Sequence, residues 1–484
     1  MRVRHVPSPH TPPVRRREIA TTYHMKTDKE KRMLDLGKDS VGQLLIKMSL
    51  PSMAAMLIMS LYSVVDAFWI GKISPEAIAA LTICFPIEIL FGAIGVGTGV
   101  GAGSFAARMF GAGNALKANR TAGQVIFLSV FFGIMVIIAG TLCSTPILRF
   151  FGATEHILPL SEQYLKIIVF GTPFLFFMMM SDYLFRAEGN PNVPMFVIIT
   201  SALVNAVLDP FLIFGWGPFP EMGVRGAGLA TAVSQCSTSF LSLYFLFSRR
   251  SGYRVRLRHM LPASSIIAPI YQVGFPSFVT NIAFSAVLIF YNITLAGFGH
   301  IAVAALGLAF RINGVLMMIL FGIGHGVMPM IGFNYGARNY DRIREITRVA
   351  AKISVFIAGV SFLGIEFFAH PILSLFTGDP ELLAVAVPAL RIHICTQILV
   401  GPIIVWINLF MGLGKGLTGM ALLVGRQVLL VVPLIYLLPL WFGLTGVWMA
   451  QPIANVISFA IIWYWTAREL RVLKGESERQ PALP

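Results

Sequence analysis

The sequence predicts an all-α polytopic membrane protein with twelve transmembrane helices, arranged as two six-helix repeats around a central cleft. Three observations support this fold class: the composition, a succession of apolar segments, and an internal repeat. Of the 484 residues, 56% are hydrophobic and only 12% are charged, whereas soluble domains carry about 25% charged residues. Most of the surface is therefore expected to face lipid.

Apolar segments follow one another along the whole chain. A spanning helix needs about 20 mostly apolar residues, and the sequence offers a run of this length again and again. The predicted spans lie near 45–70, 77–106, 121–144, 162–186, 193–216, 223–248, 268–298, 301–332, 348–370, 382–410, 416–441 and 444–467. The 45 Gly and 28 Pro fit such helices, because transmembrane bundles tolerate both residues.

The two halves of the chain repeat at an offset of 225 residues. The matches include Leu50-Pro51 with Phe275-Pro276, the glycines Gly97, Gly99 and Gly101 with Gly322, Gly324 and Gly326, and Gly111-Ala112 with Gly336-Ala337. Six helices per repeat is an even number, so both halves share one orientation and are related by an axis along the membrane normal. One such lobe can rock against the other, which is typical of transporters.

The repeat and the polar segments around it give the domain organisation. We expect a basic cytoplasmic tail at 1–40, an N-lobe of six helices at 41–248, a cytoplasmic linker at 249–265, a C-lobe of six helices at 266–467, and a second cytoplasmic tail at 468–484. The first tail contains no apolar stretch that could serve as a signal peptide. Met25 begins a second plausible start, so translation of residues 1–24 stays open.

The net charge of +15 arises from Lys and Arg in the tails and in loops on one side of the membrane. This asymmetry predicts that both termini are cytoplasmic in a bacterial or archaeal inner membrane, and it removes the need for a nucleic-acid partner. The four cysteines lie in apolar segments without paired spacing, so we expect neither a disulfide nor a metal site. We expect a monomer surrounded by membrane lipids.

Ionisable residues inside apolar segments are costly and are therefore candidate functional groups. Asp66 lies near the outer end of the first helix, and Asp209 lies in the fifth helix at a similar depth. Asn205 precedes Asp209 by four residues and shares its helix face. Residues 225 positions after the two acids are Tyr291 and Leu434, so the repeat itself does not require these carboxylates. Such a site could load a proton or hold Na⁺.

Other ionisable residues leave alternatives open. Glu88, near the middle of the second helix, either adds to this site or lines the cleft. Asp182 lies near the inner end of the fourth helix, where a structural role is as plausible as a functional one. The glycine-rich run at 95–103 lies inside a spanning segment with no strand before it, which argues against a dinucleotide site.

Several segments resemble the multidrug and toxic compound extrusion (MATE) family. The resemblance rests on 50–71, 91–114, 185–195 and 205–210, and extends over about residues 36 to 470. It implies antiport, in which H⁺ or Na⁺ enters while an amphiphilic, often cationic drug leaves. By this resemblance the ion-coupling residues are Asp66, Asn205 and Asp209, the supporting residues are Tyr164, Thr231 and Asp182, and Pro51 kinks the first helix.

The second branch of that family carries acids on helices seven and ten, and here 266–298 and 382–410 contain none. The resemblance therefore favours a proton-coupled protein without a cofactor, although Na⁺ at Asp66, Asn205 and Asp209 stays open. The main alternative is a flippase for a lipid-linked precursor from the same superfamily. A membrane enzyme or receptor is a further alternative, but no HExxH, GxSxG or Walker motif supports it.

Overall fold

The computed structural model describes residues 34–479, apart from the side chains of Ser63, Val64 and Ala67. Every regular element in this range is helical, which confirms the all-α class. The predicted basic tail at 1–40 and the second plausible start at Met25 fall largely outside the described residues. The same holds for the end of the second tail.

The first half of the described chain forms a bundle of long helices. In chain order these are α2 (Val41–Gly71), α3 (Pro75–Gly111), α4 (Ala115–Leu142), the short α5 (Ser144–Phe150), α6 (Leu158–Ala187), α7 (Asn192–Phe214) and α8 (Val224–Phe247). A linker with one short helix, η2 (Leu257–His259), follows.

The second half repeats this pattern with more interruptions. Its helices are α9 (Ser264–Ala296), α10 (His300–Gly336), α11 (Tyr340–Ser374), α12 (Pro380–Ile394), α13 (Gln397–Leu413), α14 (Gly416–Val424), the π-helical η3 (Gly425–Val431), α15 (Val432–Leu437) and α16 (Pro439–Glu478). The N-terminal caps of α4 and α11 are also related by the repeat. Asn114 accepts the Lys117 N–H at the start of α4, and Asn339 accepts the Arg342 N–H at the start of α11.

The prediction of twelve spans is confirmed. Eleven helices within residues 34–479 are long and apolar enough to cross a membrane, and α12 and α13 together form the twelfth span, with a bend of 46°. The bend falls inside the predicted span 382–410. There Thr396 leaves the helical conformation and its hydroxyl accepts a hydrogen bond from Asn455 of α16 at 3.0 Å, so a side chain stabilises the break.

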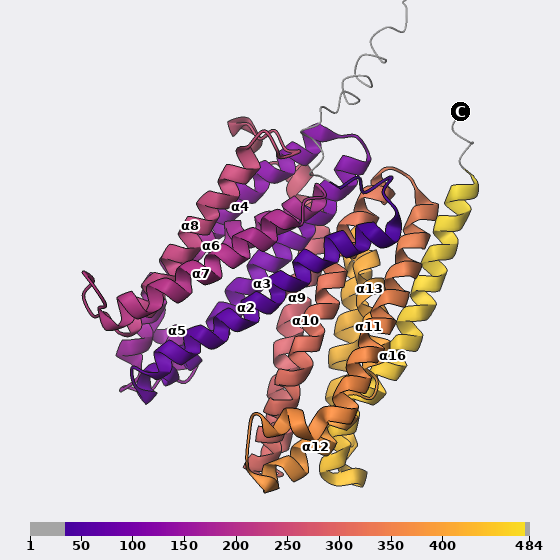
Figure 1. Cartoon of the computed structure of the whole chain (residues 1–484). Coiled ribbons are helices and arrows are strands. Elements are labelled where there is room, and N and C mark those ends of the chain that lie inside the picture. The colour runs from indigo at the N-terminus through magenta and orange to yellow at the C-terminus, as the bar shows by residue number, and fades with distance from the viewer. Residues whose placement is uncertain (1–33, 480–484) are drawn as a thin grey trace, which may run out of the picture.

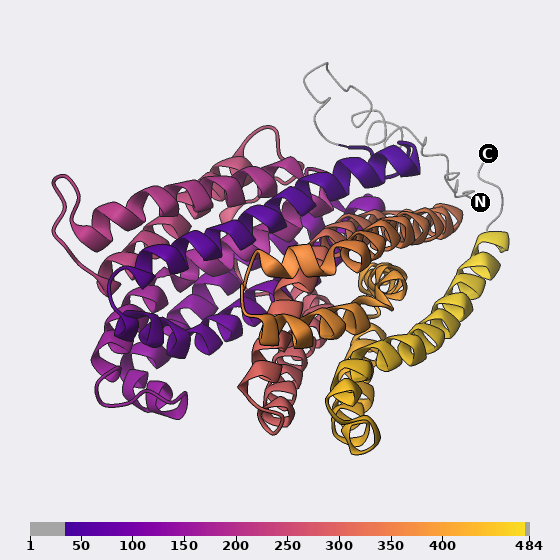
Figure 2. The ribbon, with the colours of Figure 1, turned by 60° about the horizontal axis from the view of Figure 1, so that its bottom comes forward.

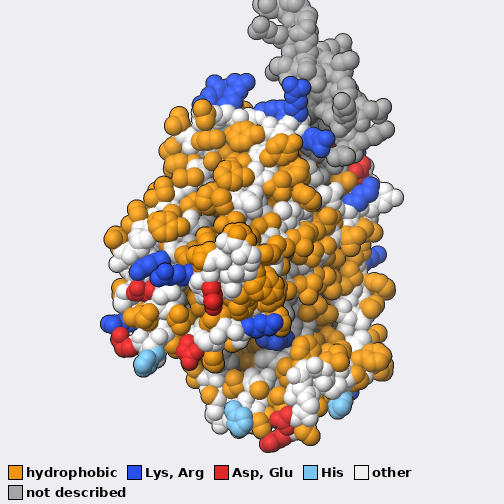
Figure 3. All heavy atoms as spheres, turned by 60° about the vertical axis from the view of Figure 1, so that its left-hand side comes forward, with side chains coloured by type: hydrophobic (Ala, Val, Ile, Leu, Met, Phe, Trp, Pro, Cys, Tyr) orange, Lys and Arg blue, Asp and Glu red, His pale blue; other side chains and the backbone are white. Residues whose placement is uncertain are grey.

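The helices form two lobes, α2–α8 and α9–α16 (Figure 1). The first and last described helices begin and end on the same face of the molecule, which we call the N/C face (Figures 1 and 2). The lobes lie close together at this face and diverge toward the opposite face. Charged side chains gather near the two ends of the helices and leave a mostly hydrophobic belt between them (Figure 3).

Glycines bring the two lobes together in the half nearer the N/C face. A Cβ on Gly111 would lie 1.8 Å from the Phe333 carbonyl oxygen, and a Cβ on Gly336 would lie 1.9 Å from the Arg108 carbonyl oxygen. Gly336 lies 225 positions after Gly111, and Phe333 lies 225 positions after Arg108. The repeat therefore relates the two contacts to each other. Backbones that approach so closely are typical of small-residue helix packing in membranes.

A second pair of contacts obeys the same relation. Gly97 of α3 faces Phe278 of α9, and Gly322 of α10 faces Met53 of α2. Each member of one contact lies 225 positions from a member of the other. The sequence repeat therefore corresponds to a pseudo-twofold relation between the lobes. The paired glycine contacts lie where the two lobes meet around this pseudo-twofold axis.

The linker between the lobes is fastened to the first lobe. The Gln124 side chain of α4 donates to the carbonyl oxygens of His259 and Leu261 at 2.8 and 2.7 Å. The carboxylate of Glu188, just after α6, accepts from the Gly252 N–H at 2.8 Å and from the Ser251 hydroxyl at 3.0 Å. The linker therefore moves with the N-lobe.

Gly336→Ala is expected to lower the thermal stability of the purified protein, because the added methyl meets backbone and overpacking costs about 1–3 kcal/mol. The matched control is Gly307→Ala in the same helix, where the methyl enters open space. Ala is favoured over Gly in a helix by about 1 kcal/mol, so the control should be unchanged or more stable. Thermal unfolding in detergent measures both, and equal losses would contradict the close contact.

Glu188 predicts a pH dependence of stability. Burial raises the pKa of its carboxyl from 4.5 to about 7, so the stability present near pH 4.5 is lost as pH rises through 7. The loss is on the order of 1 to 3 kcal/mol. Glu188→Gln should flatten the thermal stability profile across this window, whereas Glu345→Gln at an exposed position should not. An unchanged profile in Glu188→Gln would show that another group titrates.

Candidate functional site

Polar side chains from five helices meet inside the first lobe. Its members are Asp66 of α2, Glu88 of α3, Tyr164 of α6, Asn205 and Asp209 of α7, and Thr231 of α8, and we call this set the N-lobe cluster. All six are residues that the sequence analysis selected. Nothing in their sequence spacing required six residues on five helices to converge, so the convergence is a property of the fold.

Asn205 connects the two helices at the centre of this cluster. Asn205 and Asp209 are fully buried, with 0% of each exposed. In the orientation that satisfies its neighbours, the Asn205 amide donates to Asp209 Oδ2 at 3.0 Å. Its oxygen accepts from the Thr231 hydroxyl at 3.3 Å and from the Thr231 N–H at 3.2 Å. Pro210 follows Asp209 within the continuous helix α7.

The three carboxyl groups of the cluster interact with one another. Asp66 has electrostatic interactions with both Asp209 and Glu88. Asp66 Oδ1 and Asp209 Oδ1 have no hydrogen-bond partner, and within residues 34–479 none of the three groups forms an ion pair. Asp209 is buried and the other two carboxyls are partly buried. Carboxylates that share such a site without a cation can bind protons or small cations, because desolvation and mutual repulsion oppose full ionisation.

Tyr62 also belongs to this region, although it was not among the residues selected from the sequence. This tyrosine lies beside Thr231 and interacts with Asp66, Asp209 and Glu88. The signal was available, because Tyr62 lies four residues before Asp66 and so on the same face of α2. Tyr164, which was selected from the sequence, interacts with Glu88. Two phenols therefore line the carboxylate group.

Asp182 does not join the cluster. It forms an ion pair at 2.9 Å with Arg186, one turn later on α6. Arg186 in turn contacts His325 of α10, whose ring lies 5.6 Å from the Tyr183 ring. Asp182 therefore lies at the interface between the lobes. This placement suits the structural alternative that the sequence left open.

Pro51 also lies at this interface. The helix α2 continues through Pro51 without a break. The adjacent Ser52 hydroxyl donates to the Met48 carbonyl at 3.1 Å, and Met53 contacts Gly322 of the other lobe. Any bend at Pro51 would therefore change the contact between the lobes.

The corresponding region of the second lobe has the opposite charge. Tyr291 and Asn313 occupy the positions 225 residues after Asp66 and Glu88. Arg426, in the π-helical η3, is buried and interacts with Tyr291. Arg426 Nε, the Tyr291 hydroxyl and Asn313 Oδ1 have no hydrogen-bond partner. The sequence analysis missed Arg426, although a single Arg in the middle of an apolar span was a visible signal.

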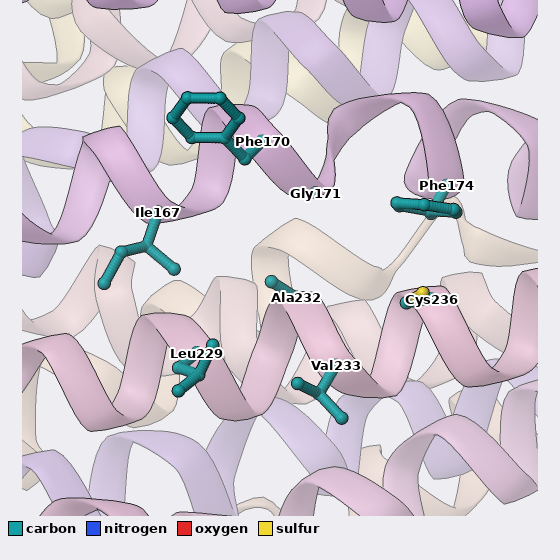
Figure 4. A pocket seen from close by; sticks show the side chains of 8 residues that line it. All are labelled: Ile167, Phe170, Gly171, Phe174, Leu229, Ala232, Val233 and Cys236. Atoms are coloured by element: carbon teal, nitrogen blue, oxygen red, sulfur yellow. The ribbon is translucent and has the colours of Figure 1, made fainter.

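An apolar pocket lies between α6 and α8, beside Tyr164 and Thr231 on the same helices. It has a volume of about 250 Å³. Figure 4 shows its lining: Ile167, Phe170, Gly171 and Phe174 from α6, and Leu229, Ala232, Val233 and Cys236 from α8. With no charged group in this lining, the pocket suits an apolar group and not an ion. Across residues 34–479, no three His, Cys, Asp or Glu residues form a metal-binding group.

Comparison with known proteins matches both halves of the chain. The MatE family model matches residues 51–211 and 276–437. The FAD transporter of Shewanella oneidensis is 28% identical over 440 residues, which cover 90% of this chain and 96% of the relative. The multidrug export protein MepA of Staphylococcus saprophyticus is 26% identical over 454 residues, 93% of this chain and 99% of the relative.

Solved structures agree over the same extent. A structure described as the outward-facing conformation of a multidrug resistance MATE family transporter of the MOP superfamily superposes with a TM-score of 0.85 at 26% identity, covering 93% of this chain and 99% of the other. A MATE crystal structure in the bent conformation gives a TM-score of 0.87 at 27% identity and the same coverage.

Proposed function

The chain belongs to the MatE family of membrane transporters, and from this premise we propose that it is a cation-coupled antiporter that exports amphiphilic, often cationic compounds. The observation that carries the proposal is the N-lobe cluster. Asp66, Glu88 and Asp209 come from three helices, interact with one another, and have no ion-pair partner within the described chain. Ionisable groups at this depth in a membrane are costly and mark ion pathways and proton relays.

The coupling ion in this proposal is H⁺. Asp66 and Asp209 exchange the proton, and Asn205 holds the Asp209 carboxylate by donating to Oδ2. A proton suits the site because repulsion between Asp66 and Asp209 is relieved when one of them is protonated. Na⁺ is the competing ion, since carboxylate, amide and hydroxyl oxygens are also its usual ligands.

Transport proceeds in this proposal by alternating access. The N/C face is cytoplasmic, as the distribution of Lys and Arg predicts, so the lobes diverge toward the outside and a proton enters from there. Proton and cargo compete for the N-lobe, and closing the outer side requires the glycine contacts near the N/C face to part. The binding energies of proton and cargo then select between the two arrangements of the lobes.

Ion-driven efflux in proteoliposomes tests this function. Asp66→Asn and Asp209→Asn should each reduce ethidium transport driven by a pH gradient to the level of protein-free liposomes, because an amide cannot exchange the proton. Glu366→Gln is the control, since Glu366 pairs at 3.4 Å with Arg391 outside the cluster. A parallel experiment with a Na⁺ gradient and no pH gradient shows which of the two ions drives transport. Normal transport in both Asp variants would refute the coupling site, and inactivity of the wild type would favour the lipid flippase.

A second class of cargo, an anionic dinucleotide, is favoured by one observation. Arg426 is buried in the C-lobe without a carboxylate partner in the described chain, and one relative is named a FAD transporter. A phosphate group would compensate the buried guanidinium, which otherwise carries a desolvation cost.

Arg426→Met should therefore abolish FAD export from loaded proteoliposomes while ethidium export continues. The two cargoes serve as controls for each other, because a misfolded variant would lose both. Equal export of FAD by the variant and the wild type would exclude Arg426 as the anion-binding group.

A further inference from the structure

A basic pocket lies where the C-lobe meets the N/C face, and we propose that it binds the phosphate headgroup of an anionic phospholipid from the adjoining leaflet. The pocket has a volume of about 360 Å³ and lies between α11, α13 and α16, of which α11 and α16 run side by side (Figure 1). Its location is separate from the N-lobe cluster and from the contacts between the lobes.

Five cations line this pocket and no carboxylate does. They are Arg344, Arg348 and Lys352 of α11 and Arg471 and Lys474 of α16. The first three recur every four residues and so share one face of α11, while the other two are three residues apart on α16. The two helices therefore direct their basic faces toward the same space.

Neighbouring acids do not neutralise this charge. Arg344 pairs with Asp341 at 3.3 Å and Lys474 pairs with Glu478 at 3.5 Å, but both acids are exposed, and such pairs contribute little. Arg348, Lys352 and Arg471 have no ion pair with any residue in 34–479. Arg348, Lys352, Arg471 and Lys474 are exposed, so water solvates them, but like charges this close together repel one another and a bound anion would offset that repulsion.

The remaining lining favours a lipid over a soluble anion. Trp406 and Trp463 line the pocket together with Ala351 and Leu470, and Trp463 is 57% exposed. Along α16, Trp463 lies about 16 Å deeper in the span than Lys474, at 1.5 Å per residue. The cations begin with Arg344 near the N/C face and extend to Lys352, about 12 Å further along α11, and the tryptophans line the deeper part beside Lys352. This lining matches a headgroup and the start of its acyl chains.

Basic pockets between transmembrane helices at the cytoplasmic side are known to accept anionic lipid headgroups, and tryptophan prefers the membrane interface. A lipid held here would join α11 to α16 on the outer flank of the C-lobe. The inference uses the proposed cytoplasmic location of the N/C face only to choose the leaflet. It does not depend on the coupling ion or on the cargo.

Tryptophan quenching by brominated lipids tests the pocket. The full-length protein is reconstituted in phosphatidylcholine bilayers that contain a small fraction of phosphatidylglycerol with brominated acyl chains, or brominated phosphatidylcholine as reference. The wild type should prefer brominated phosphatidylglycerol. Arg348→Gln/Arg471→Gln should weaken this preference roughly thirtyfold, because each of the two cations near an anionic lipid contributes about 1 kcal/mol. Trp463→Phe should reduce the charge-selective part of the quenching and leave the part that comes from Trp406, which lines the same pocket.

The matched control is Arg249→Gln/Arg250→Gln, two exposed cations at the same face of the other lobe. An equal loss in this control would reduce the effect to general surface attraction and overturn the proposal. Unchanged preference in the pocket variant would also overturn it. Displacement of the lipid by inorganic phosphate at matched ionic strength would assign the pocket to a soluble anion. Arg471→Gln alone repeats the test if the double variant unfolds.

Discussion

The hydrocarbon of a membrane supplies no hydrogen-bond partners, and the rest of this structure follows from that constraint. Backbone groups must be satisfied within each segment, so helices are the available spanning element. Side chains face the same cost, so a polar group in the interior must find a partner or exchange one with its surroundings. The N-lobe cluster provides only some of the hydrogen-bond partners that its carboxyl groups need. Asn205 satisfies one oxygen of Asp209, while the other oxygen has no hydrogen-bond partner.

The same constraint explains why the lobes meet through glycine. Hydrophobic attraction does not drive helices together in lipid, so their association depends on close van der Waals contact. Gly111 and Gly336 let backbone touch backbone between α3 and α10, and the repeat produces each contact twice. A contact built from two equivalent halves can loosen symmetrically, which suits two lobes that rock about an axis between them.

The lobes share a frame but differ in charge. Carboxylates fill the interior of the first lobe, while the corresponding region of the second contains Tyr291 and Arg426. A further group of cations lies on the lipid-facing flank of the second lobe. Duplication therefore supplied the architecture, and divergence of single residues gave the lobes different chemistry.

Most of the fold could be predicted from the sequence, because span number, repeat offset and turn positions depend on hydrophobicity and residue type along the chain. The exceptions depend on particular residues. The bend between α12 and α13 depends on Thr396 and Asn455, which are 59 residues apart, and the π-helical turn at 425–431 leaves no periodic signal. The carboxylates of the site were also predictable, since charge inside an apolar span is visible in one dimension.

The sequence by itself determined the twelve spans, the pseudo-twofold relation of the lobes, and the lack of acids in the second-lobe spans 266–298 and 382–410. Only the tertiary structure decided which side chains meet. Successive residues differ by about 100° around a helix, so the rotation of each helix decides whether Asp182 turns to Arg186 or to the cluster. It also decides that Tyr62 faces Thr231 and that basic faces of α11 and α16 line one pocket. Those rotations depend on packing between segments far apart in the chain, for which a single sequence carries no direct signal.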